Sequence, residues 1–242
     1  MFSSPLKTMP DRPGDRPLGI FGGTFDPVHY GHLRLAEEAA EGLDLAGVRW
    51  IPAGQPALRS RPHVNARQRL AMVRLATADN PRFSVDAAEV EADRPSYTVP
   101  TLERLRQVDQ CGRQRPLVLL VGADAFAGLP GWHRWRSLFD LAHLAVAQRP
   151  GFPIEDACLP ADLASCYHDR FSASPAALAE SPAGRIVTFT MSQLAISATQ
   201  IRGLLTKGHS SRYLLPDEVI AYIQTEHLYR SEEHTSELQS LS

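Results

Sequence analysis

The chain has 242 residues, enough for one or two domains with a full core, and its 43% hydrophobic and 21% charged residues exclude disorder for most of its length. The 25 Lys and Arg residues and 27 Asp and Glu residues give a formal net charge of −2, which argues against a nucleic-acid coat protein or a polybasic membrane binder. The three cysteines, Cys111, Cys158 and Cys166, form no Cys-x-x-Cys pair and indicate neither a disulfide framework nor a structural zinc site.

The first 17 residues are polar and contain Pro10, Pro13, Gly14 and Pro17, so they are predicted to form a flexible leader. This leader lacks the apolar stretch of a secretory signal. Further along the chain, no apolar run approaches the roughly 20 residues that a membrane span requires. We therefore expect a protein of the reducing cytosol without a membrane-spanning part.

From residue 18 onward, short apolar runs alternate with amphipathic segments. Strands are predicted at 18–21, 48–52, 83–85, 116–122, 143–147 and 186–189. Helices are predicted after Gly31, at 65–79 and at 98–108, with a further one beginning at Ser197. The run 116–122 is apolar throughout, as expected for a strand inside a parallel sheet. The alternation predicts an α/β fold with a doubly wound parallel sheet.

Two segments depart from this alternation. Residues from about 152 to 184 are rich in Ala, Ser and Pro and predict a surface insertion of loops and short helices. Residues 230–242, beginning RSEEHTSELQS, look like the translation of a sequencing adapter rather than part of a natural fold, and they are left out of the functional argument. The alternative, a genuine polar tail, would also carry no function.

The segment from Gly22 to His32 reads GGTFDPVHYGH and lies between a predicted strand and a predicted helix. An open α/β sheet binds ligands at this position, beyond the carboxyl ends of its strands. Gly22 and Gly23 allow a tight turn and the close approach of an anion to the backbone. His29 and His32 are three residues apart and should project from the same face of the first helical turn, where they could donate to phosphate oxygens.

Two other interpretations of the histidine pair stay open. A His-x-x-His pair can share a metal ion, although no third ligand is evident nearby. The two histidines could also cap the helix without any chemical role.

A second motif, Ile196-Ser197-Ala198-Thr199-Gln200-Ile201-Arg202, has the pattern of a capping box. Its free backbone N–H groups and the hydroxyls of Ser197 and Thr199 would form another anion site, and Arg202 could present its guanidinium to phosphate. The alternative is an ordinary capped helix with a solvated arginine.

Together, the His-x-Gly-His segment and the ISATQIR segment resemble the HxGH adenylyltransferases of the nucleotidyltransferase superfamily. The set GGTFDPVHYGH, SYTVPTL, VGADAF, LPGW, AQRPG and ISATQIR is similar to the bacterial nicotinate-nucleotide adenylyltransferases over roughly residues 18–228. The resemblance implies a Rossmann-like nucleotidyltransferase domain at 18–229 with a small C-terminal helical part. It also implies that ATP and nicotinate mononucleotide are joined, with Mg²⁺, to give deamido-NAD and pyrophosphate in NAD biosynthesis.

The resemblance further implies that His29, His32 and Arg202 are the catalytic residues. It implies that ATP contacts Gly22, Gly23, Thr24, Phe25, His29, His32, Gly122, Asp124, Ile196, Ser197, Thr199 and Arg202. It implies that nicotinate mononucleotide contacts Tyr97, Thr98, Trp132, Arg149 and Arg59. The alternatives are that Trp132 is a core residue and that Asp124 caps the helix after Gly122. Mg²⁺ would be held mostly by phosphates and water, and no protein ligand is named for it.

Two competing functions are weighed against this one. A pantetheine-phosphate adenylyltransferase would belong to the same superfamily, but such chains are normally shorter and lack the SYT and LPGW segments. A catalytically silent nucleotide-binding protein would have lost a motif residue, whereas His29, His32, Ser197, Thr199 and Arg202 are all present. The preference for the acid over the amide mononucleotide and a homo-oligomeric state both stay open.

Overall fold

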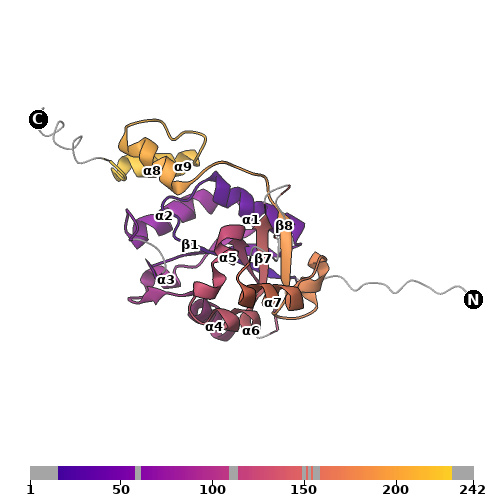
Figure 1. Cartoon of the computed structure of the whole chain (residues 1–242). Coiled ribbons are helices and arrows are strands. Elements are labelled where there is room, and N and C mark those ends of the chain that lie inside the picture. Colours follow the sequence, from indigo (N-terminus) through magenta and orange to yellow (C-terminus); the bar gives the residue numbers. More distant parts are fainter. Residues whose placement is uncertain are drawn as a thin grey trace, which may run out of the picture.

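The computed structural model describes residues 16–57, 61–108, 114–148, 151, 154 and 159–230. Its centre is a six-stranded, wholly parallel sheet with the spatial order β4-β2-β1-β6-β7-β8 (Figure 1). The strands are β1 (Leu18–Gly23), β2 (Gly47–Pro52), β4 (Phe83–Val85), β6 (Leu117–Gly122), β7 (His143–Gln148) and β8 (Ile186–Thr190). A second sheet pairs the short strands β3 (Gln55–Pro56) and β5 (Pro95–Ser96).

Helices connect the strands and cover both faces of the large sheet. The α-helices are α1 (Tyr30–Gly42), α2 (Ala66–Thr77), α3 (Ala88–Glu91), α4 (Thr98–Val108), α5 (Ala123–Ala127), α6 (Leu138–Leu141), α7 (Ala161–Arg170), α8 (Ala198–Thr206) and α9 (Asp217–Thr225). Short 3-10 helices lie at Leu129–Gly131, Trp135–Ser137 and Pro175–Ala179. Figure 1 shows α8 and α9 as a pair at one end of the molecule, beyond α1 and α2. This arrangement confirms the doubly wound fold with a small C-terminal helical part.

The strand order fixes where a ligand can bind. Numbered along the chain within this sheet, the strand order is 3-2-1-4-5-6. The direction in which successive strands are added therefore reverses between β1 and β6. The loops that leave these two strands turn to opposite faces of the sheet, which opens a crevice at their carboxyl ends. Gly23 ends β1 and Gly122 ends β6, so both predicted glycine segments lie at this reversal.

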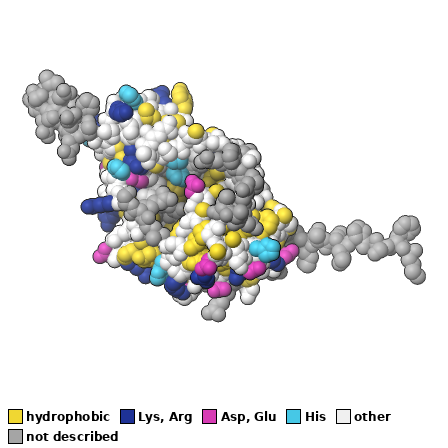
Figure 2. Space-filling model, viewed as in Figure 1, with side chains coloured by type: hydrophobic (Ala, Val, Ile, Leu, Met, Phe, Trp, Pro, Cys, Tyr) yellow, Lys and Arg dark blue, Asp and Glu magenta, His cyan; other side chains and the backbone are white. Residues whose placement is uncertain are grey.

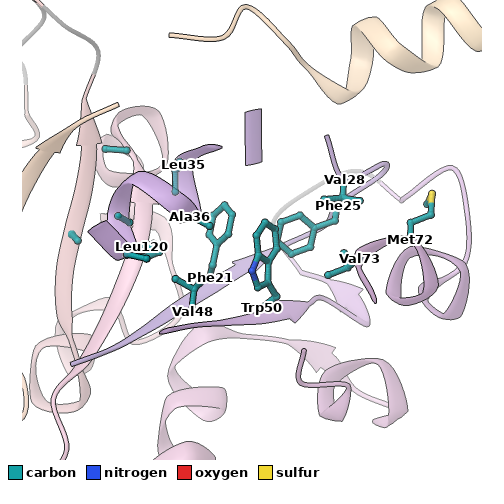
Figure 3. Packing of buried hydrophobic residues seen from close by; sticks show 14 of the residues in the cluster. Phe21, Phe25, Val28, Leu35, Ala36, Val48, Trp50, Met72, Val73 and Leu120 are labelled. Carbon is teal, nitrogen blue, oxygen red and sulfur yellow. The ribbon is translucent and has the colours of Figure 1, made fainter. Parts of the chain in front are cut away.

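The core consists of two apolar layers, one on each face of the sheet. Alternate side chains of β6 enter opposite layers, as the period of a strand requires: Val118 and Leu120 pack with α1, α2, α8 and α9, whereas Leu117 and Leu119 pack with α4, α5, α6 and α7. In the first layer Trp50 is fully buried and lies between Phe21 and Phe25, with ring centroids 4.9 and 5.3 Å away (Figure 3). This aromatic cluster supports the loop after β1.

The predicted strands and helices agree with the observed elements to within about two residues at most ends. The region predicted as a surface insertion differs in part: its described portion contains the ten-residue helix α7, whose Leu163 is fully buried in the second core layer. The apolar spacing of Leu163 and Tyr167 on one helix face explains this burial. Helix α9 was not predicted, and it adds Val219, Ile220 and Ile223 to the first layer.

Most of the predicted leader and tail lies outside the described residues. The end of the leader is part of the fold, because Arg16 forms an ion pair with Asp44 and the carbonyl of Pro17 accepts the N–H of Ala46 at 2.8 Å. Among the described residues, no helix is long and apolar enough to cross a membrane. Figure 2 shows charged side chains of both signs interspersed over the visible face, in keeping with the nearly balanced composition.

Candidate functional site

The loop after β1 leaves the sheet at Gly23 and turns back on itself. A Cβ atom on Gly23 would lie 2.8 Å from the ring of Phe25, so glycine is required for this turn. Phe25 has a left-handed backbone (φ 51°), and its side chain is buried beside Trp50 and beneath His32, with ring centroids 5.3 and 5.1 Å away. The side chain of Phe25 is therefore a support for His32, and any contact of Phe25 with a nucleotide would come from its backbone.

The two histidines lie together at the start of α1. Their rings stack with centroids 3.7 Å apart, which confirms that they project from the same face. His29 is the residue before the helix, and its backbone N–H donates to Nδ1 of His32 at 3.3 Å. The capping interpretation is thus correct for the backbone of this turn. It does not account for the imidazole of His29, which is buried although its Nδ1 has no hydrogen-bond partner among the described residues.

Burial also decides the charge of this imidazole. Desolvation lowers the pKa of His29 to about 4, so the ring is neutral at pH 7. Gly31 leaves room for it, because a Cβ there would lie 3.0 Å from Nδ1 of His29. A buried neutral imidazole at a helix N-terminus is a directional donor or acceptor that needs a polar ligand.

The lowered pKa predicts that stability falls on acidification. The unfolded chain protonates His29 below pH 6.5, whereas the folded chain resists until about pH 4, so stability is lost as the pH falls through this window. The expected contribution is about 3 kcal/mol. Substituting His29→Asn keeps a good capping residue and removes the titration. In urea unfolding, the free energy of unfolding should fall less between pH 7 and pH 4.5 for His29→Asn than for the wild type.

A buried histidine elsewhere must be separated from this effect. Burial also lowers the pKa of His143, whose Nε2 bonds to the carbonyl of Ser181 at 2.8 Å. Because His143 is present in both proteins, its contribution cancels in the difference between wild type and His29→Asn. Unfolding free energies with parallel pH dependence in the two proteins would contradict the assignment to His29.

The second motif, Ile196–Arg202, lies in contact with the loop that contains the first. One terminal nitrogen of Arg202 donates to the carbonyl of Asp26 at 2.7 Å, and the other donates to Thr199 Oγ1 at 3.3 Å. The carbonyl of Ile196 lies 3.6 Å from the position that a Cβ on Gly31 would take. The N-termini of α1 and α8 therefore meet at one place, although about 170 residues separate them in the chain.

Helix α8 begins where the sequence predicts. Ser197 precedes the first helical residue, and its Oγ accepts the backbone N–H of Gln200 at 3.2 Å. The linker before it is held by Glu38 of α1, whose carboxylate accepts the backbone N–H and the hydroxyl of Ser192 at 2.7 and 2.6 Å. These hydrogen bonds, with the ion pair to Arg34, lower the pKa of Glu38 against the effect of burial. They fix the approach of the ISATQIR segment.

Beneath the loop lies a buried polar network that the sequence interpretation missed. Arg69 of α2 is 1% exposed and donates to the carbonyls of Thr24 and Gly54 at 2.7 and 2.9 Å. Burial lowers the pKa of Arg69, and the neighbouring carboxylate of Asp26 opposes that shift. The sequence contains a signal for this burial, because Arg69 lies on the same face of the predicted helix as Met72 and Val73, both of which are buried.

The segment after β6 lies across the reversal of the sheet from the histidine loop. Gly122 precedes α5, and Asp124 is an exposed residue of its first turn. The N-cap position belongs to Gly122 and no side-chain cap bond is formed, so the interpretation of Asp124 as the capping residue is wrong. The carboxylate of Asp124 points into solvent at the crevice end of the sheet, where a polar ligand could reach it.

Tyr97, Thr98 and Trp132 are all half-buried. The ring of Tyr97 lies 4.8 Å from the ring of His133, the residue that follows Trp132 in the chain. Trp132 also packs against the second core layer, so the core interpretation holds for part of its surface. A network links this region to the loop after β2: Ser96 Oγ accepts the N–H of Gly54 at 2.9 Å.

The same network includes a half-buried acid, Glu89. Burial raises the pKa of Glu89, while hydrogen bonds from Thr101 and Ser96 oppose the shift. Glu89, Arg94, Tyr97 and Arg104 line a small open pocket of about 30 Å³ beside the SYT segment. Arg59 and Arg149, the two remaining predicted substrate residues, lie outside the described residues. Within the described part of the chain, no three His, Cys, Asp or Glu side chains are grouped so that they could hold a metal ion.

The chain is similar to known proteins in sequence and in fold. The model of the cytidylyltransferase-like family matches residues 20–204. A protein of Dechloromonas aromatica named "Probable nicotinate-nucleotide adenylyltransferase" is 66% identical over 215 residues, which cover 89% of this chain and 98% of that protein. A protein of the same name from Acidithiobacillus ferrooxidans is 48% identical over 217 residues, or 88% and 96% of the two chains.

Solved structures show the same fold. The nicotinic acid mononucleotide adenylyltransferase of Plasmodium falciparum, in a complex with NaAD, superposes with a TM-score of 0.66 at 14% sequence identity. The match covers 88% of this chain and 97% of that one. At this identity the likeness concerns the fold.

Proposed function

The chain belongs to the cytidylyltransferase-like family, among its nicotinate-nucleotide adenylyltransferases, and from this premise we propose how its residues divide the work of the reaction. The enzyme joins ATP to nicotinate mononucleotide and releases pyrophosphate, giving deamido-NAD in NAD biosynthesis. The observation that carries the proposed division is the meeting of two helix N-termini, one bearing His29 and His32 and the other bearing Arg202.

Adenylyl transfer depends more on stabilising negative charge and orienting the reactants than on acid–base catalysis. A phosphate oxygen of the mononucleotide attacks the α-phosphorus of ATP in line, a bond forms there, and the bond to the departing pyrophosphate breaks. The attacking oxygen is already ionised at neutral pH, so no general base is required. Two anions must instead be brought together, and orientation of this kind can supply about 7–11 kcal/mol of the barrier.

His29 and His32 would contact the phosphates of ATP from the N-terminus of α1. The unpartnered Nδ1 of His29 supports this role, because a buried polar nitrogen is costly until a ligand satisfies it. Gly22, Gly23 and the backbones of Thr24 and Phe25 would line the nucleotide groove. The backbone N–H groups at the start of each helix add a favourable dipole for anions.

From the N-terminus of α8, Ser197, Thr199 and Arg202 would hold the β- and γ-phosphates, with Ile196 beside them. Arg202 is already oriented by the carbonyl of Asp26 and the hydroxyl of Thr199, so less freedom is lost when phosphate binds. As charge builds on the pyrophosphate, the guanidinium would stabilise it. Asp124, with Gly122, would bind the ribose of the nucleotide across the sheet reversal.

The nicotinate mononucleotide would lie near Tyr97, Thr98 and Trp132. The exposed part of Trp132 would stack on the pyridine ring, and N–H or O–H donors would select its carboxylate. Arg59 and Arg149 would contact the phosphate of the mononucleotide or the rim of the site. We place the enzyme in the cytoplasm, where a free thiol such as Cys166 persists.

Mg²⁺ would enter the site with ATP. This ion prefers phosphate oxygens and retains several of its waters, and it would neutralise charge on the phosphates as they react. Arg202 would then add positive charge from the protein side, and His29 and His32 would add hydrogen bonds to the phosphates. No carboxylate of the chain is assigned to the ion.

The proposal is tested by pyrophosphate release with ATP and each of three acceptors: nicotinate mononucleotide, nicotinamide mononucleotide and phosphopantetheine. We expect kcat/KM for the nicotinate acceptor to exceed that for the amide by at least about tenfold, because the site would hydrogen-bond the carboxylate. Turnover of phosphopantetheine alone would point to the related transferase. Binding of ATP without release from any acceptor would show a silent nucleotide-binding protein.

A further inference from the structure

The carboxylate of Asp26 is buried inside the loop that carries the histidines. It is 6% exposed, and each of its oxygens has a partner from a distant part of the chain. Oδ1 accepts the hydroxyl of Tyr229 at 2.7 Å, and Oδ2 accepts the backbone N–H of His63 at 2.8 Å. A buried carboxylate needs such bonds, because leaving one unmade incurs the full desolvation penalty.

Tyr229 reaches this position from beyond α9. Its backbone is left-handed (φ 61°), as is that of His227 (φ 53°), and non-glycine residues rarely adopt this conformation. The carbonyl of Tyr229 accepts the hydroxyl of Thr206 on α8 at 3.3 Å. Strained backbone persists where the surrounding contacts hold it, and here the contacts turn the tyrosine ring toward Asp26.

The backbone of Asp26 continues the connection to the site. Its carbonyl accepts the guanidinium of Arg202 at 2.7 Å, and His29 follows only three residues later. Asp26 is therefore held at two points: its side chain by the hydroxyl of Tyr229, and its backbone carbonyl by the guanidinium of Arg202. Helix α9 packs against α2, and Tyr229, which follows α9, reaches the loop through its hydrogen bond to Asp26.

We propose that Tyr229 is a positioning residue for adenylyl transfer: its hydroxyl holds the carboxylate of Asp26 and thereby fixes the loop that carries His29 and whose Asp26 carbonyl orients Arg202 of α8 toward the phosphates. This inference rests on the function proposed above. Burial and the neighbouring carboxylate raise the pKa of Tyr229 far above its usual value, so the hydroxyl stays a donor over the whole working pH range. The phenol acts on the reaction only through Asp26.

The test substitutes Tyr229→Phe in the full chain, which removes one oxygen and keeps the ring. The matched control is Tyr222→Phe, on a half-buried tyrosine of α9 that packs against the same core layer. We expect kcat to fall roughly ten- to a hundredfold in Tyr229→Phe, because small displacements of phosphate-binding groups have effects of this size. KM for ATP should change less than kcat, and Tyr222→Phe should stay within twofold of wild type.

A merely structural tyrosine would behave differently. It would lower the melting temperature of Tyr229→Phe and leave kcat within twofold of wild type at a temperature where both proteins are folded, and this result would overturn the proposal. An equal loss of kcat in Tyr222→Phe would overturn it as well. If the wild type itself released no pyrophosphate, the proposed function would fail, which is a separate outcome from a failure of Tyr229→Phe to differ.

A second variant tests the other partner of the same hydrogen bond. Asp26→Asn keeps the size of the side chain and removes its charge. If Tyr229 acts through Asp26, the double variant with both substitutions should lose no more kcat than the more impaired of the two single variants. The two effects should therefore not multiply. Multiplying effects would show two independent roles and contradict the proposal. Asp26→Asn also provides a measurement should Tyr229→Phe fail to fold.

Discussion

Replacing His32 with alanine is expected to reduce kcat/KM for adenylyl transfer by about 10²–10³, the effect of removing one well-placed donor to developing charge. The imidazole of His32 stacks on His29 with centroids 3.7 Å apart and rests on the edge of Phe25. Neither neighbouring ring can take its place, because His29 would already make its own phosphate contact and the side chain of Phe25 has no polar atom. Steady-state kinetics with ATP and nicotinate mononucleotide would measure the loss.

The fold should survive this change. His32 Nδ1 accepts the backbone N–H of His29 at 3.3 Å, and losing this hydrogen bond should lower the free energy of unfolding by about 1 kcal/mol. The matched control is His168→Ala, at an exposed position in the last turn of α7, where activity should be unchanged. A folded His32→Ala enzyme with near-wild-type turnover would show that this imidazole does not contact the reacting phosphates.

Substituting Arg69→Met should lower the free energy of unfolding by about 3–6 kcal/mol, since two buried hydrogen bonds from a charged group are lost at about 1.5–3 kcal/mol each. The carbonyls of Thr24 and Gly54 would be left without this donor, and Asp26 would lose a neighbouring positive charge. Such a loss approaches the whole stability of many domains. Denaturant unfolding followed by tryptophan fluorescence would measure it, since Trp50 lies in the adjoining core layer.

Arg67→Met provides the control for Arg69→Met. Arg67 lies two residues earlier on α2 and is exposed, so its replacement should change stability by no more than about 0.5 kcal/mol. Equal effects of the two substitutions would mean that the bonds of Arg69 do not hold the loops after β1 and β2 together. Arg69→Lys is expected to recover only part of the stability, because an ammonium cannot reach two carbonyls with a planar fork.

The loop after β1 is held from three directions. Arg69 holds it from α2, Arg202 from α8 and Tyr229 from the end of the described chain. The C-terminal helical part is thus a component of the phosphate site, since α8 supplies one of its two helix N-termini. Preorganisation of this kind lowers the entropy lost when the triphosphate binds.

Local patterns in the sequence predicted a large part of this architecture. The apolar run 116–122 predicted a buried strand, observed at Leu117–Gly122, and the alternation of strands and helices predicted a doubly wound sheet. The spacing of His29 and His32 predicted their shared face, and the pairing of Ser197 with Gln200 predicted the start of α8. These features depend on neighbours within about four residues, so the periods of helix and strand are sufficient to reveal them.

Other features depend on which distant segments meet, and no local pattern contains that information. The contact of Tyr229 with Asp26 joins residues 203 positions apart, and that of Arg202 with the carbonyl of Asp26 joins residues 176 positions apart. The neutrality of His29 and the inward position of Arg69 likewise follow from burial. The sequence by itself determined the elements and the chemistry of the two motifs; the tertiary structure decided which polar groups are buried together, because desolvation arises only when the helices pack on the sheet.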